Sequence, residues 1–144
     1  MNADFKKVES QIDFEQNIKK LIDEAVFLAA QINVKEIKSG LDTSTGPKGP
    51  IKKVKAKTAR QKRKKGFPIK PLVRTGMMRR LPPVKGKSGK STISLAKKRV
   101  DVAQYHEQGA GNLPKREFFD IYPSAERKIE RMLKKRLVKL FKKL

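Results

Sequence analysis

The single histidine of the chain, His106, is followed directly by Glu107, and a histidine–carboxylate pair can exchange protons in acid–base catalysis. Residues adjacent in sequence need not face each other, and no nucleophile or set of metal ligands accompanies this pair. The 144 residues contain no cysteine, which excludes disulfide scaffolds, thiolate zinc sites and cysteine nucleophiles. We therefore expect a structural histidine near a turn, no catalytic residues, no metal site and no cofactor.

Residues 86–91, with the sequence GKSGKS, have the composition of a phosphate-binding loop. Such a loop needs the spacing G-x-x-x-x-G-K-[ST], a buried strand before it and a helix after it. Here Val84 stands five residues before Gly89, and strand-like residues follow the segment instead of preceding it. The sequence therefore does not predict a nucleotide site.

Positive charge is concentrated in the middle of the chain. The net charge is +23, of which residues 1–45 contribute −2, residues 46–100 contribute +20 without one acidic residue, and residues 101–144 contribute +5. An acid-free block of this length repels itself, so it indicates a polyanion or an acidic protein nearby, in preference to a merely solvated basic surface.

The densest basic segment spans residues 52–65 and is the candidate surface for contact with DNA or a partner. Because Phe67 is the only aromatic residue between Ile51 and Val102, stacking on bases is poorly provided for, and any nucleic-acid contact is expected to be with the phosphate backbone. The alternative, which we favour slightly, is an extended arm laid along a neighbouring protein. The candidate residues are Lys52, Lys53, Lys55, Lys57, Arg60, Lys62, Arg63, Lys64 and Lys65.

Hydrophobic periodicity predicts the elements that position these residues. An apolar stripe with a period of 3.6 residues predicts an N-terminal helix over 4–33, most clearly 13–32, with a possible break near Ser10 and an end at 38–40. Glycine and proline then predict an extended loop over 39–56. A short basic helix follows over 58–65, capped by Thr58 and ended by Gly66.

Alternating residues predict two strands, near 91–96 and 100–105, in one antiparallel sheet, after a loose segment at 82–90. A final amphipathic helix over 124–142, capped by Ser124, is expected to dock on that sheet; the alternative is a basic helix on a membrane surface. Docking would bury Leu137, so Leu137→Asp is expected to cost several kcal/mol, because it buries an unpaired charge. The longest apolar run, residues 25–30, is far too short to cross a bilayer.

These elements predict an α+β fold, with an N-terminal helix and a C-terminal amphipathic helix packed on a small antiparallel β-sheet and with long basic loops. The expected organisation is a single domain over 1–144: an N-terminal helix at 1–38, a basic extended arm at 39–67, and the sheet with the C-terminal helix at 68–144.

Three motifs in order resemble those of one family, the virion morphogenesis, neck and tail-completion proteins of long-tailed phages. The first is KTxxxK at 57–62 followed by PLVRTGMMRR at 71–80, the second is AQYHEQG at 103–109, and the third is LPKREFF at 113–119. The resemblance covers roughly residues 50–144. The chain departs from the family pattern at Leu81, where serine is usual, and at Pro82 and Pro83, which shorten the strand that normally follows.

The resemblance implies a ring at the head–tail junction of a virion that is assembled in the host cytoplasm. The implied partners are further copies of the chain, portal or adaptor, head-closure or tail-terminator rings, and packaged double-stranded DNA bound without sequence preference; no membrane is implied. The alternative is a non-specific basic nucleic-acid-binding protein of the ribosomal or nucleoid type. The motif residues with structural roles are Thr75, Gly76, Tyr105, His106, Gly109, Pro114, Arg116 and Phe118.

Within the third motif, Phe118 or Phe119 is expected to anchor the segment that enters the last helix. Arg116 is then expected to pair with Glu107 or with a neighbouring subunit.

Overall fold

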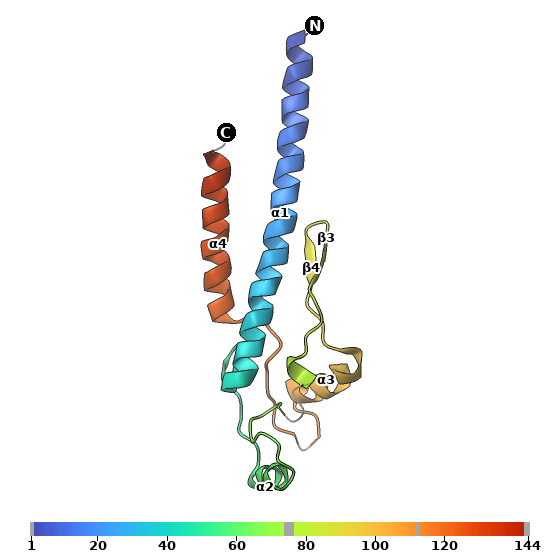
Figure 1. Cartoon of the computed structure of the whole chain (residues 1–144), viewed down its shortest axis with the longest axis vertical. Coiled ribbons are helices and arrows are strands. Elements are labelled where there is room, and N and C mark those ends of the chain that lie inside the picture. The colour runs from blue at the N-terminus through green and yellow to red at the C-terminus, as the bar shows by residue number, and fades with distance from the viewer. Residues whose placement is uncertain (1, 74–76, 112, 143–144) are drawn as a thin grey trace.

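A long helix forms the spine of the molecule, and every other element is attached to its side or to its C-terminal end (Figure 1). The structure is a computed structural model that describes the backbone of residues 2–73, 77–111 and 113–142; side chains are described from residue 14 onwards, except those of Met77, Lys87 and Lys98. Thr75 and Gly76, from the first motif, lie outside the described residues. The fold class is α+β, as predicted, with a helix near each end of the chain.

The spine, helix α1 (Asn2–Thr43), confirms the predicted N-terminal helix but is longer than expected. It is continuous through Ser10 and passes the predicted end at 38–40, because Ile37 and Leu41 extend the apolar stripe and are almost fully buried. Gly40 lies within this last part, where a Cβ atom would stand 2.5 Å from the hydroxyl oxygen of Tyr122. The glycine therefore allows a close contact here and does not end the helix.

The predicted loop at 39–56 is more ordered than the sequence indicates. After α1, strands β1 (Thr45–Gly46) and β2 (Gly49–Pro50) form a two-stranded antiparallel hairpin. Helix α2 (Ala56–Lys64) follows and confirms the short basic helix, although Lys55 and not Thr58 precedes its first turn. Gly66 ends this region with a positive φ of 65°, which glycine adopts without strain.

The predicted strands at 91–96 and 100–105 are wrong in extent and partner. Strand β3 (Lys85–Lys87) pairs with β4 (Lys90–Thr92) in a hairpin, so the loose segment at 82–90 supplies one of the two strands. After the 3-10 helix η2 (Lys97–Arg99), residues at the second predicted strand form helix α3 (Val100–Gln108). Periodicity cannot separate a strand from a helix in so short an apolar run, and burial of Ala103 against the core decides for the helix.

Helix α4 (Pro123–Phe141) confirms the predicted C-terminal helix. It lies beside α1, antiparallel to it, and not on a sheet (Figure 1). Ser124 is not the cap; its hydroxyl donates to the carboxylate of Glu36 on α1 at 2.5 Å. Farther along α4, Arg136 donates to Glu24 at 3.1 Å. Leu137 is 47% exposed, so the expectation that it is buried is wrong.

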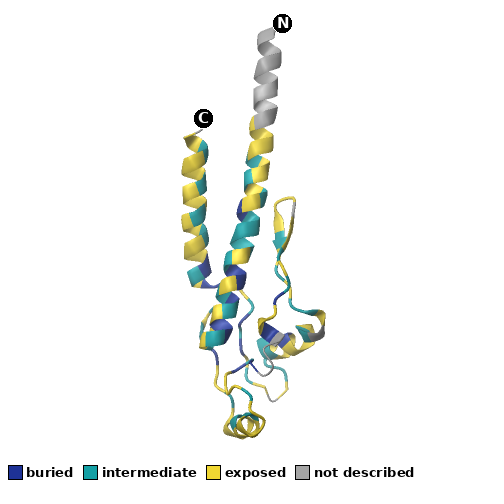
Figure 2. Cartoon of the chain, in the orientation of Figure 1, coloured by how far each residue is buried: buried dark blue, intermediate teal, exposed yellow. Residues whose placement is uncertain are grey.

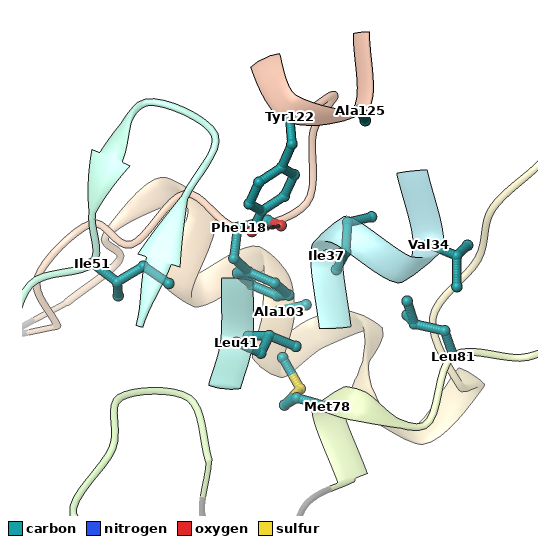
Figure 3. Packing of buried hydrophobic residues seen from close by; sticks show 10 residues of the cluster. All are labelled: Val34, Ile37, Leu41, Ile51, Met78, Leu81, Ala103, Phe118, Tyr122 and Ala125. Carbon is teal, nitrogen blue, oxygen red and sulfur yellow. Dashed lines mark hydrogen bonds between the residues drawn. The ribbon is translucent and has the colours of Figure 1, made fainter. Parts of the chain in front are cut away.

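The hydrophobic core lies at the C-terminal end of the spine, where α1, α3, the 3-10 helix η1 (Met77–Arg79) and the segment before α4 meet (Figure 3). Phe118, Ile37 and Leu41 are its largest fully buried side chains. The ring of Phe119 packs edge-on against that of Phe118, with centroids 6.3 Å apart. Phe118 thus takes the anchoring position expected of the third motif. In the far half of the two-helix stem formed by α1 and α4, most of the residues whose burial is described are exposed (Figure 2).

Candidate functional site

The second and third motifs pack against each other at the joint between α3 and the segment that leads into α4. The carboxylate of Glu107 accepts hydrogen bonds from the backbone N–H groups of Phe118 and Phe119, at 2.7 and 2.8 Å. The backbone N–H of Arg116 donates to the carbonyl oxygen of His106 at 2.7 Å. Two motifs that are separate in the sequence therefore form one structural unit.

Arg116 is buried at the centre of this joint, with 6% of its surface exposed. Its guanidinium donates to the backbone carbonyl oxygens of Lys52 and Lys53, at 2.9 and 3.3 Å, and one of its nitrogens lies 3.4 Å from Nδ1 of His106. The expected Arg116–Glu107 pair is wrong, because Glu107 is turned to the backbone of the next segment. Arg116 instead ties the start of the basic arm to α3.

Burial and neighbouring charges shift the pKa values of His106 and Arg116 in this joint. Loss of solvent contact lowers the pKa of His106, and the positive charges of Arg116 and Lys62 lower it further. Burial also lowers the pKa of Arg116. His106 therefore has a cation beside it in place of a carboxylate, which disfavours the imidazolium that a histidine–carboxylate pair would stabilise. Among the described residues, no group of three acidic, histidine or cysteine side chains is placed to hold a metal ion.

The other motif residues that the structure describes have backbone or surface roles. Gly109 ends α3 with a φ of 72°, and a Cβ there would stand 3.0 Å from the backbone nitrogen of Lys115. Tyr105 is exposed, at 54%. Pro114 lines a hollow between α2 and α3.

That hollow has a volume of about 510 Å³ and is mostly apolar, with Phe67, Leu72 and Val102 among its lining residues. Lys55, Lys62 and Arg116 also line it, and none of its described lining residues is acidic. The hollow lies between the basic arm and α3.

The nine candidate cations of the basic arm do not form one surface. Lys52 and Lys53 expose their side chains while their carbonyl oxygens receive Arg116. Lys62 turns toward its own chain and donates to the carbonyl oxygens of Lys70 and Val73, at 2.7 and 2.9 Å. Its ammonium group holds α2 against the segment that follows. No sequence pattern distinguishes this structural role of Lys62 from that of the other six lysines among the nine cations.

Helix α2 itself lies at the end of the molecule remote from the N-terminus and buries none of its residues (Figure 1). Lys57, Arg60 and Lys64, spaced three and four residues apart, share one exposed face. Arg63 and Lys65 are exposed as well. This face is the part of the arm best placed to meet a polyanion or an acidic protein.

A second candidate surface, which we did not predict, lies on the two-helix stem. Helix α4 exposes Leu133, Leu137 and Phe141, spaced four residues apart, and Val138 beside them. On α1, Phe14 and Ile22 are also exposed. The signal was present in the sequence, because the apolar positions of α4 are too many and too widely spread around the helix for a single contact stripe.

Comparison of the chain with protein families, with curated proteins and with solved structures finds no match to any of them. Within the part of the chain that the structure describes, no helix combines the length and the apolar character that crossing a membrane requires.

Proposed function

We propose that this protein is a structural component of the neck of a long-tailed phage, where copies of it form a ring at the head–tail junction. The proposal combines the order of the three sequence motifs with the surface of the folded chain. It assigns the protein to the virion, and it gives the protein further copies of itself and adjacent neck rings as partners.

The observation that carries the proposal is the amount of surface that the single chain leaves exposed. Its accessible surface is 11059 Å². A compact monomer of 16.4 kDa is expected to expose only about 7,500 Å² by the usual scaling of surface with mass. The surplus of about 3,500 Å² falls within the range that subunits bury in obligate assemblies, roughly 2,000–5,000 Å².

The distribution of charge supports the same proposal. Helices α2 and α4 each carry a net charge of +5, whereas α1 and α3 each carry −2. Within one copy, α4 already pairs with α1 through Arg136 and Glu24, yet the other cations of α4 and those of the α2 face stay exposed. Further copies of the chain can bring acidic surface to these exposed cations. The role of Glu107 and Arg116 in joining two of the motifs also gives those motifs a structural purpose that needs no catalytic one.

Electron microscopy of the purified protein tests the proposal. We expect ring-shaped particles with one rotational symmetry and a central channel. Particles without a ring at any protein concentration or salt concentration would argue against a neck-ring component.

Non-specific binding of nucleic acid remains a second candidate function, because the exposed cations of α2 stand in a stretch of 55 residues without an acid. We expect the triple variant Lys57→Gln, Arg60→Gln, Lys64→Gln to bind duplex DNA more weakly. If all three contact phosphates, the slope of log K against log salt concentration should fall by about 2–3. Lys62 is left in place because it holds the arm.

A matched control removes the same charge from α1, through Lys20→Gln, Lys35→Gln and Lys38→Gln. Equal loss of DNA binding in the two triple variants would show that net charge, and not the face of α2, controls binding. Loss of docking to a neighbouring neck protein, with DNA binding unchanged, would assign the α2 face to protein–protein contact.

A further inference from the structure

We propose that the ring contact is made by the stem, with the exposed apolar face of α4 in one copy seated against the α1–hairpin side of the next copy. This inference rests on the proposed ring and adds the surface that closes it. The occupant of the α4 face is therefore a second copy of this chain.

The donor surface is the C-terminal half of α4. Leu137 and Phe141 are 47% and 69% exposed, whereas Leu140 on the same turns faces the space between α4 and α1. Residues 133–141 contain no acid and include Lys134, Lys135 and Lys139.

The receiving surface is a hollow between α1 and the tip of the β3–β4 hairpin, with a volume of about 310 Å³. Ile18 and Ile22 supply its apolar part, and Ile22 is 48% exposed. Glu15, Asp23 and Lys19 also line it, which leaves a net negative charge. The carboxylate of Asp23 accepts a hydrogen bond from the backbone N–H of Gly89 in the hairpin turn, so the wall of the hollow is fixed to the spine.

The donor and receiving surfaces lie at the same height along the stem. Arg136 of α4 pairs with Glu24 of α1 within one copy, which places Leu137 beside the turn of α1 that contains Ile22. A ring whose axis runs along the stem relates its copies by rotation without translation, so surfaces that meet must share one height. The exposed residues of α3 lie near the other end of the stem and do not satisfy this condition (Figure 1).

Charge and apolar character match across the proposed contact. A leucine-rich face of a basic helix would meet an acidic, isoleucine-lined hollow, which favours association. In the proposed contact α4 of one copy meets α1 of the next without the reverse contact between the same two copies, so it is heterologous, and a heterologous contact is the kind that repeats around a ring. Two α4 faces packed on each other would instead bring together helices of net charge +5.

Two single substitutions, one on each surface, test this contact by native mass spectrometry. Leu137→Asp places a charge in the donor surface and leaves the receiving hollow unchanged. Ile22→Asp places a charge in the receiving hollow and leaves the donor surface unchanged. We expect each variant alone to be monomeric. An equimolar mixture is expected to give a one-to-one complex of twice the chain mass that grows no further, because only one intact contact exists. Ile69→Asp, at an exposed position that is in neither surface, is the control and should still form the ring.

Disulfide trapping gives a second measurement that does not depend on the folding of the aspartate variants. The chain has no cysteine, so Leu137→Cys and Ile22→Cys each introduce a single thiol. We expect a covalent dimer only when the two variants are mixed and oxidised. Self-linking of Leu137→Cys alone would mean that two α4 faces meet, and it would overturn the inference.

Failure of the stem contact can be separated from failure of the ring. If the wild-type chain forms rings and both aspartate variants still do so, the contact is wrong while the proposed function stands. If wild-type, control and variant chains are all monomeric, the ring itself is contradicted. Binding of the wild-type chain to anionic lipid vesicles that is lost in Leu137→Asp, with rings retained, would assign the α4 face to a membrane and overturn the inference.

Discussion

The carboxylate of Glu107 accepts a hydrogen bond of 2.7 Å from the backbone N–H of Phe118, the residue whose side chain fills the centre of the core. This contact joins the C-terminal part of α3 to the segment before α4. It explains why the second and third motifs, at 103–109 and 113–119, form one structural unit. Loss of either residue is expected to loosen both α3 and the attachment of α4.

Phe118→Ala is expected to be the more damaging of the two phenylalanine truncations. Phe118 is fully buried, so its removal should lower the free energy of unfolding by about 3–5 kcal/mol. Phe119 is only partly buried, and Phe119→Ala should cost clearly less. Chemical denaturation monitored by circular dichroism measures both values, and equal losses would contradict the assignment of Phe118 as the anchor.

Glu107→Ala is expected to lower the free energy of unfolding because two backbone N–H groups lose their acceptor. Hydrogen bonds to charged groups contribute about 1.5–3 kcal/mol each. Glu107→Gln keeps one carbonyl oxygen as an acceptor and should recover part of the loss. Gln108→Ala, at the exposed neighbouring position, provides the baseline in the same urea titration. A Glu107→Ala variant as stable as this baseline would show that the contact contributes nothing.

Stability is expected to fall at high pH through Tyr122. Burial, together with the carboxylates of Glu107 and Glu36, raises the pKa of Tyr122 to about 12. A raised pKa in the folded state stabilises the fold below the unfolded pKa of about 10, and this contribution is lost as pH rises from there through 12. Tyrosinate absorbance in a Tyr105→Phe background follows the titration of Tyr122 alone.

Tyr122→Phe separates this effect from the deprotonation of lysines. The variant should lose about 1 kcal/mol at neutral pH, because the hydroxyl donates to the carbonyl oxygen of Phe118 at 3.1 Å. Above pH 10 its stability should fall less steeply than that of the wild type. If stability falls equally steeply with pH in the variant and in the wild type, deprotonation of Tyr122 is not the cause of the fall.

Leu137→Asp is expected to leave the stability of the monomer within about 0.5 kcal/mol of wild type, because Leu137 is exposed. Ile129→Asp, on the same helix, should cost several kcal/mol, since Ile129 packs against the core and its replacement buries an unpaired charge. Thermal unfolding of the two variants below the concentration of assembly measures the contrast. A large loss for Leu137→Asp would mean that α4 buries this face within the single chain.

The helices could be predicted where their apolar pattern was long. The stripe of α1 and the heptad-like spacing of α4 extend over many turns, and both helices were found. Val100 and Val102 belong to a run of only six residues, for which the strand and helix patterns overlap, and tertiary burial of Ala103 settled the choice. Gly40 was wrongly predicted to end the helix, because tertiary packing determines its role as well. Its small size allows Tyr122 to approach α1 closely.

The candidate surfaces were predictable in charge but not in arrangement. Counting lysines identified the basic arm, yet only the structure shows that Lys62 is used to hold two backbone carbonyl oxygens. The hydrogen bond from Arg116 to the carbonyl oxygen of Lys52 could not be predicted either. Sequence patterns show which side chains are charged, but they do not show which backbone carbonyl groups need a donor.

Native mass spectrometry of the wild-type chain over a range of protein and salt concentrations tests the central claim, that exposed stem surface is buried by further copies of the chain. We expect a closed oligomer of one stoichiometry that loses no subunits on modest dilution and weakens when salt screens the α1–α4 charges. A chain that stays monomeric under all these conditions, with its surplus surface still open to solvent, would contradict the account.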